Sequence, residues 1–320
     1  MNCTSNTESL DQNSENIEEP TENVEEVTLN VVEIALDIKA ELGEGALWNY
    51  RTQELYWVDI NGKKLHIYNP LTKQNNSFTT PSKIGTVVPK NEDEVLIALE
   101  DGVYVMDLNT GNTALFSNMA SVLPNSRLND GKCDSSGKFW VGSMQNSQET
   151  GKANLYAIGA TGTYDLKIDN VTVSNGITWS LNETIMYYID TPTSKIKAYD
   201  YNSTTGEISN GRVVVSIPTS LGFPDGMTID AEGMLWVGMW NGNAVIRFNP
   251  ITGNVMSKIE IPAHNITSCA FGGENLETLY ITTASIDMTA AEKVMYPKAG
   301  AIFKVNPGVK GVNCNFFKTN

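Results

Sequence analysis

The sequence repeats a pair of short strand patterns six times, and this repeat constrains the fold more than any other feature. In each unit an apolar segment follows a small or polar residue, and a polar turn leads to a second segment rich in aromatic and β-branched residues. The first segments begin at Gly45, Gly85, Asp130, Asn175, Asp225 and Ser268, and their partners begin at Leu55, Val95, Phe139, Met186, Leu235 and Leu279. A period of roughly 40 to 50 residues is typical of β-propeller blades. The sequence therefore predicts an all-β, six-bladed β-propeller with four-stranded antiparallel blades around a central channel.

A propeller must close its ring, and the sequence offers a strand for this purpose. We expect one propeller domain over residues 29–320. Its blades are predicted near residues 43–80, 84–117, 127–170, 174–217, 224–262 and 267–306. The apolar segment 31–36 precedes the first blade, and we predict that it becomes the outer strand of blade six. Residues 284–299 interrupt blade six and are expected to form a long loop over one face of the disc.

The first 28 residues differ in composition from the remainder of the chain. They contain eight acidic residues and no Lys or Arg. Their charge of −8 is about half of the net charge of −15 of the whole chain. Segments with few apolar residues and high net charge do not bury enough surface to fold, so residues 1–28 are predicted to be a disordered acidic tail or tether. A cytoplasmic location is favoured. A periplasmic or lipid-tethered location through Cys3 stays open if a signal sequence has been removed.

Several other classes of protein are disfavoured by the sequence. There is no basic patch or recognition motif for nucleic acid, and no run of about 18 apolar residues that would span a membrane. No extended apolar surface pattern stands out, so a monomer is expected. Cys133 and Cys269 lie in apolar strands and are predicted to be core residues. The two histidines, His66 and His264, are not at strand starts; His66 is expected on a solvated strand face, and a Ser-His-Asp triad is disfavoured.

Polar residues occupy the position at which five of the six inner strands begin. In a propeller these positions meet at one mouth of the channel, and here they are Glu44, Gly85, Asn129, Asn175, Asp225 and Ser268. Asn-Gly and Asp-Gly pairs also form turns, but four oxygen-bearing side chains at equivalent positions favour a site. Buried carboxylates without partners are costly, and a hard cation such as Ca²⁺ or Mg²⁺ is held by oxygen ligands of this kind. Zn²⁺ or Mn²⁺ would also fit.

Several segments also carry a family resemblance. The matching motifs are residues 43–48 (GEGALW), 126–132 (SRLNDGK), 174–180 (SNGITWS), 187–190 (YYID), 224–230 (PDGMTID), 267–273 (TSCAFGG) and 308–311 (GVKG). On these motifs the chain resembles the gluconolactonase/regucalcin family, also called the senescence marker protein family, which includes luciferin-regenerating enzymes. The resemblance covers about residues 33–314 and implies a six-bladed propeller.

The resemblance also implies roles for individual residues. It places one divalent cation, most readily Ca²⁺, on Glu44, Asn175 and Asp225, and it assigns sugar-lactone binding to Arg127 and Asn129. Some members carry a substrate-contacting Glu downstream of the third-blade motif, where this sequence has Ser147, so substrate preference is expected to differ.

Together these observations predict a divalent-metal-dependent hydrolase of small lactones, with sugar aldonolactones as the expected substrates. The cation would polarise the lactone carbonyl, and Asp225 is hypothesised to accept a proton from water as general base. The alternatives are an organophosphate or ester hydrolase at the same metal site, or a non-catalytic calcium-binding propeller. Arg127 is expected to bind substrate oxygens, and the alternative is a structural ion pair with Asp130 or another acid. Asp130 itself is expected to cap a turn beneath the site.

Overall fold

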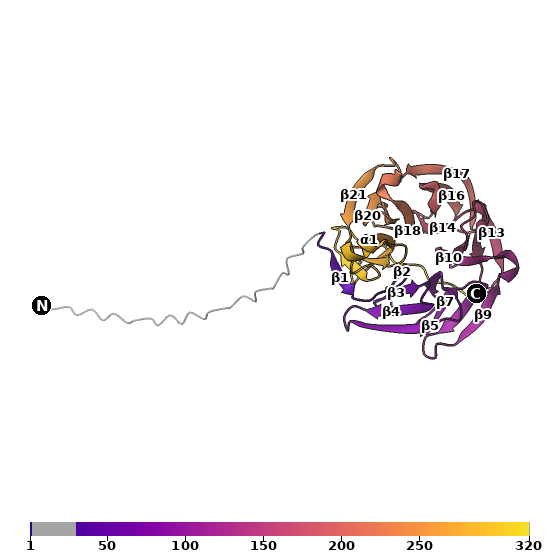
Figure 1. Ribbon diagram of the computed structural model, residues 1–320, viewed down its shortest axis with the longest axis horizontal. Coiled ribbons are helices and arrows are strands. Elements are labelled where there is room, and N and C mark those ends of the chain that lie inside the picture. Colours follow the sequence, from indigo (N-terminus) through magenta and orange to yellow (C-terminus); the bar gives the residue numbers. More distant parts are fainter. Residues whose placement is uncertain (2–29, 320) are drawn as a thin grey trace.

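The computed structural model describes Met1 and residues 30–319, and it consists of six four-stranded antiparallel sheets arranged as the blades of a propeller (Figure 1). Blades one to three contain β2 (Gly43–Asn49), β3 (Glu54–Asp59), β4 (Lys64–Asn69), β5 (Gln74–Thr79), β6 (Thr86–Pro89), β7 (Glu94–Ala98), β8 (Gly102–Asp107), β9 (Thr113–Asn118), β10 (Ser126–Cys133), β11 (Phe139–Gln145), β12 (Ala153–Ile158) and β13 (Tyr164–Val171). Blades four to six contain β14 (Ser174–Trp179), β15 (Ile185–Asp190), β16 (Lys195–Asn202), β17 (Glu207–Ser216), β18 (Phe223–Ile229), β19 (Leu235–Trp240), β20 (Ala244–Phe248), β21 (Val255–Glu260), β22 (Asn265–Gly272), β23 (Thr278–Ala284), β24 (Ile302–Val305) and β1 (Glu33–Leu36). The predicted fold class is confirmed. The predicted tail, residues 1–28, lies outside the described residues apart from Met1.

The first strand of each blade lines the centre of the ring. The inner strands β2, β6, β10, β14, β18 and β22 each contact the inner strands of both neighbouring blades. Their apolar residues are almost wholly buried because each strand has a sheet on either side. All six begin at one mouth of the channel and end at the other.

Strand β1 closes the ring as the sequence predicted. It pairs antiparallel with β24, so that blade six has the order β1-β24-β23-β22 and combines both ends of the chain. The hydroxyl of Tyr68 in blade one donates to the carbonyl of Ala35 at 2.6 Å. Noncovalent contacts of β1 therefore join blade six to blade one.

Large aromatic side chains fill the space between blades. Trp57, Trp140 and Trp236 are at most 1% exposed and belong to the core. Cys133 and Cys269 are also buried and are free thiols. Indole and phenol rings bury much apolar surface each, and aromatic residues recur on the second strand of every blade except blade two, which contributes to the repeat that is visible in the sequence.

Glycines in the inner strands allow these strands to approach closely. A Cβ on Gly176 would lie 2.6 Å from the Cβ of Met227 and 2.7 Å from the carbonyl oxygen of Asp225. Gly226 is similarly close to Ser268 of the next blade. Both glycines lie within strands, so the Asn-Gly and Asp-Gly pairs do not form turns here; they are required because neighbouring inner strands come within contact distance.

Substitution of Gly176 by alanine should test this close approach. The added methyl group would push β18 away from β14, and such overpacking typically costs about 1–3 kcal/mol. Denaturant unfolding should show this loss for Gly176→Ala. Gly159→Ala is the matched control, because the nearest atom to its Cβ is 3.8 Å away; equal stability of the two variants would contradict the explanation.

The expectation that His66 lies on a solvated strand face is wrong. The side chain is 4% exposed, its ring stacks on Trp57 with 4.0 Å between centroids, and its Nδ1 is 2.9 Å from Nδ2 of Asn75. Alternation along β4 did not reveal this because the face of β4 that carries His66, together with Trp57 and Tyr68, packs against blade six. Burial lowers the pKa of His66 from 6.5 to about 4, against the opposing charge of Asp59.

The lowered pKa of His66 predicts a loss of stability in acid. In the unfolded chain His66 is protonated as the pH falls through about 6.5, whereas in the folded protein it stays neutral until about pH 4. The free energy of unfolding is therefore unaffected by His66 above pH 6.5 and decreases as the pH falls from 6.5 to 4. The shift corresponds to about 3 kcal/mol. The unfolding free energy of the wild type should fall more steeply from pH 6.5 to 4 than that of His66→Gln, which keeps an acceptor for Asn75 but does not titrate. Parallel pH profiles for the two proteins would refute this role.

The long loop between β23 and β24 contains the helix α1 (Ala290–Met295), and short 3₁₀ turns occur at Ala120–Val122, Thr191–Thr193 and Thr219–Leu221. Thr289 and Glu292 form a capping box at the start of α1. The amide of Ser285 donates to the carbonyl of Glu41, which places the loop beside the start of β2, and Figure 1 shows α1 over the disc. Among the helices of the described residues, none has the length and apolar character needed to cross a membrane.

Candidate functional site

The site residues predicted from the sequence lie at irregularities of the inner strands. The pairing register shifts between Glu44 and Leu47, Leu128 and Gly131, Ser174 and Ile177, Pro224 and Met227, and Ile266 and Ser268. Such bulges turn a side chain out of the regular alternation and are common beside active sites. In β6, by contrast, the register is unbroken from Thr86 to Pro89, and the equivalent position before this strand is Gly85, which has no side chain.

Glu44 and Asp225 form the acidic centre of the site. They are 6% and 5% exposed, and their carboxyl groups lie within hydrogen-bonding reach of each other. Burial, reinforced by the nearby charge of Asp130, raises the pKa of Glu44 to about 8. Burial and the charge of Glu44 raise the pKa of Asp225 well above its usual value. Two carboxyl groups this close cannot both ionise cheaply without a cation.

Arg127, Asn129 and Asn175 form a hydrogen-bonded row beside the two acids. Nη1 of Arg127 donates to Oδ1 of Asn129 at 2.6 Å and to the carbonyl of Leu128 at 3.1 Å. Nδ2 of Asn129 donates to the carbonyl of Ser174 at 2.8 Å and reaches Oδ1 of Asn175 at 3.5 Å. The structure thus brings all five predicted residues together.

Arg127 remains available for a ligand. It is 6% exposed, and it makes no ion pair with any acid among residues 30–319. Burial lowers its pKa to about 10, although Glu44, Glu100 and Asp225 favour its charged form. Arg127 does not form the alternative ion pair with Asp130. Its guanidinium group instead donates to Asn129 and orients that side chain.

Thr191 was missed by the sequence reasoning and orients Asn175. Its Oγ1 accepts from Nδ2 of Asn175 at 2.9 Å and donates to the carbonyl of Pro224 at 2.8 Å. Because Nδ2 of Asn175 is used by Thr191, its Oδ1 lies on the side of Asn129, whose Nδ2 is 3.5 Å away. The position of Thr191 in the sequence could have indicated this role. It directly follows the strand motif YYID, and β15 ends at the same mouth of the channel at which β14 begins.

The expectation that Asp130 caps a turn is wrong. It lies within β10, is 5% exposed, and its Oδ1 accepts from the amide of Gly131 at 2.8 Å. Its Oδ2 is buried without a partner among the described residues. Burial raises the pKa of Asp130, opposed by the charge of Lys132 further along the strand. Asp130 therefore continues the acidic centre deeper into the channel.

The donor set fits a hard divalent cation. Oδ1 of Asp225 is buried with no hydrogen-bond partner among the described residues, which is costly unless another group uses it. Glu44, Asn175 and Asp225 would present two carboxylates and an amide oxygen, which are ligands of the type that Ca²⁺ prefers. Within residues 30–319 no three His, Cys, Asp or Glu side chains gather around one point, because the third donor here is an amide.

The chain matches a family model and several named proteins. Residues 42–285 match the family model described as SMP-30/Gluconolactonase/LRE-like region. The chain is 39% identical over 267 residues to the Bacillus subtilis (strain 168) protein named "Putative sugar lactone lactonase YvrE", covering 83% of this chain and 91% of that one. It is 39% identical over 278 residues to regucalcin of Danio rerio, covering 86% and 94%.

A solved structure agrees with these sequence matches. The crystal structure of a regucalcin from Agrobacterium tumefaciens str. C58, described as a calcium-binding protein, superposes with a TM-score of 0.85 at 26% identity, covering 89% of this chain and 96% of that chain. The matched region contains every residue of the acidic centre and its hydrogen-bonded row. The chain therefore belongs to the SMP-30/gluconolactonase/LRE-like family.

Proposed function

We propose that this protein is a divalent-metal-dependent lactonase that hydrolyses small sugar aldonolactones. The observation that carries the proposal is the buried pair Glu44 and Asp225, in which one Asp225 oxygen has no hydrogen-bond partner within residues 30–319 and lies near the donors of Arg127 and Asn129. A structural role alone would not require two costly carboxyl groups at the mouth of the channel. Family membership supports the substrate class, since its relatives include a protein named for sugar lactones.

Each residue has a proposed role. Glu44, Asn175 and Asp225 would hold the cation, with Ca²⁺ as the expected ion. When bound, the cation would polarise the lactone carbonyl and stabilise the charge that develops on its oxygen. Arg127 would donate to oxygens of the substrate, and Asn129 would bind a sugar hydroxyl.

Asp225 is also proposed as the general base. Burial and the charge of Glu44 raise the pKa of Asp225 above that of an ordinary carboxyl group, and a bound cation would favour the ionised form that accepts a proton. Oδ1, which has no partner among the described residues, is the atom expected to receive the proton of the attacking water. Burial excludes bulk water and strengthens these polar interactions.

Metal removal tests the proposal directly. Proton release from D-glucono-δ-lactone should fall to the uncatalysed rate after treatment with EDTA and recover on addition of Ca²⁺, with Mg²⁺, Mn²⁺ and Zn²⁺ compared in parallel. Activity that persists unchanged in EDTA would refute metal dependence. Saturable Ca²⁺ binding without hydrolysis across a panel of lactones would instead favour a calcium-binding propeller, which the description of the Agrobacterium relative supports.

A further inference from the structure

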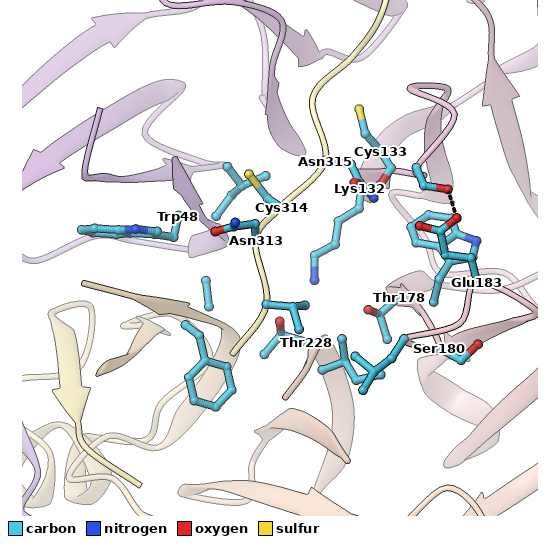
Figure 2. Close-up of a pocket in the computed structure, with 18 of the residues that line it drawn as sticks. Trp48, Lys132, Cys133, Thr178, Ser180, Glu183, Thr228, Asn313, Cys314 and Asn315 are labelled. Atoms are coloured by element: carbon cyan, nitrogen blue, oxygen red, sulfur yellow. Dashed lines mark hydrogen bonds between the residues drawn. The ribbon is translucent and has the colours of Figure 1, made fainter. Parts of the chain in front are cut away.

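The channel has a second mouth, on the face opposite the acidic centre, and a cavity lies there. Its volume is about 220 Å³, and it is lined by the last residues of five inner strands (Figure 2). These include Trp48 of β2, Cys133 of β10, Thr178 of β14, Thr228 of β18 and Phe271 of β22. Because these strands begin at the proposed metal site, their ends form a site that is separate from it.

A segment after the last blade forms one wall of this cavity. Residues 312–315 line it, and the chain beyond them is fixed to blades two and three. The amide of Phe317 donates to the carbonyl of Pro89 at 2.8 Å, the amide of Lys318 to Gly137 at 3.1 Å, and Nδ2 of Asn315 to Cys133 at 3.3 Å. The phenyl rings of Phe316 and Phe317 are buried. The wall is thus ordered structure built across the mouth.

A single cation, Lys132, enters the cavity from the channel. Among the residues that line the cavity it is the only Lys or Arg, and Figure 2 shows its side chain extending to the middle of the space. Its Nζ donates to the carbonyl of Met227 and has no other hydrogen-bond partner among the described residues. The lone acid of the lining, Glu183, already accepts from Ser135 at 2.6 Å.

The surroundings of Lys132 favour an anionic partner. Burial lowers its pKa, and the charge of Asp130, on the same strand toward the metal site, opposes this effect. An ammonium group with unused N–H donors in an enclosed space is stabilised by a bound anion. Hydroxyl groups of Thr178 and Thr228 lie on the same lining and can donate to the anion as well.

Most of the remaining wall is apolar, and this favours a ligand with an apolar body. The apolar lining includes Trp48, Trp179, Leu181, Ile229 and Phe271, and the other polar residues of the wall are Ser135, Ser180, Asn313 and Asn315. Sites for drug-sized ligands measure about 300–1,000 Å³, so the cavity admits only a smaller molecule. A polyhydroxylated acid would leave its hydroxyl groups against apolar walls, whereas an aromatic or aliphatic carboxylate would bury its body there.

We propose that this cavity is a second ligand site, in which Lys132 binds the carboxylate of a small molecule whose apolar body packs between the aromatic walls. The site goes beyond the proposed hydrolysis and does not depend on it. It also gives a function to a buried lysine that has no part in the proposed reaction.

Benzoate is a suitable probe, with benzyl alcohol as its neutral analogue and gluconate as a polar carboxylate. Titration of the calcium-loaded protein, followed by calorimetry and by the fluorescence of Trp48 and Trp179, should show saturable binding of benzoate. Benzyl alcohol and gluconate should bind at least tenfold more weakly. Equal affinity for benzyl alcohol, or no saturable binding of benzoate at millimolar concentration, would overturn the proposal.

Variants locate the binding. Lys132→Met should weaken benzoate binding at least tenfold, and Lys132→Arg should retain it. Leu181 is half exposed at the cavity, so Leu181→Glu should weaken and Leu181→Lys strengthen binding severalfold without threatening the fold. Asp225→Asn should leave benzoate affinity unchanged. Benzoate binding that survives Lys132→Met and is insensitive to charge at Leu181, or that is lost in Asp225→Asn, would show that the anion binds elsewhere.

Discussion

Asp225→Asn should reduce kcat for lactone hydrolysis by about 10²–10⁴-fold, the range expected for loss of a general base. The substitution preserves shape but replaces the basic carboxylate with an amide that does not accept a proton, and it weakens the proposed cation site. The pH-stat rate with D-glucono-δ-lactone at saturating Ca²⁺ is the measurement. A rate within tenfold of the wild type would exclude Asp225 as the base.

The same variant should not lose stability in the absence of metal. The amide removes a buried carboxyl group that has an unpartnered oxygen, so the melting temperature in EDTA should equal or exceed that of the wild type. Asp134→Asn is the matched control, because Asp134 is also fully buried but accepts from Trp140 at 2.8 Å and Tyr201 at 2.8 Å. That variant should lose about 1–3 kcal/mol. If both variants lose stability equally, Asp225 is a structural acid.

Removal of β1 should destabilise the whole ring. A chain that starts at residue 38 lacks the pairing of residues 33–36 with β24 and the contact of Ala35 with Tyr68. Each lost hydrogen bond contributes about 1 kcal/mol, and the exposed edge of β24 would favour aggregation. We expect a loss on the order of 3–5 kcal/mol in denaturant unfolding.

A chain that starts at residue 30 is the control for this truncation. It retains β1 and should unfold at the same denaturant concentration as the full chain. Equal stability of the chains starting at residues 30 and 38 would show that the outer strand is dispensable and that the other contacts of blade six hold the ring closed.

The fold could be predicted from the sequence because the repeat is local. Each blade contains its own alternating strands and turn residues, so the strand bounds and even the role of residues 31–36 followed from pattern alone. The five proposed metal and substrate residues were also found together, since the start of every inner strand must lie at one mouth.

Features that depend on tertiary contacts of single side chains could not be predicted in this way. His66 alternates like a surface residue, but its exposure is decided by the neighbouring blade. Asp130 precedes a glycine as a turn residue would, yet the glycine serves the close approach of β10 to β11 in the same blade, where a Cβ on Gly131 would lie 2.3 Å from the carbonyl oxygen of Trp140. The orientation of Asn175 by Thr191 depends on a hydrogen bond between segments 16 residues apart.

The contrast between blade two and blade six limits how this centre can be redesigned. At Gly85 a Cβ would lie 2.4 Å from the carbonyl oxygen of Leu128, so no side chain can be introduced at that position. The equivalent residue of blade six, Ser268, already has a side chain, whose hydroxyl lies beside Gly226. In laboratory evolution, extra ligands for a metal with a higher coordination number would therefore arise more readily at position 268 than at position 85, which would stay glycine.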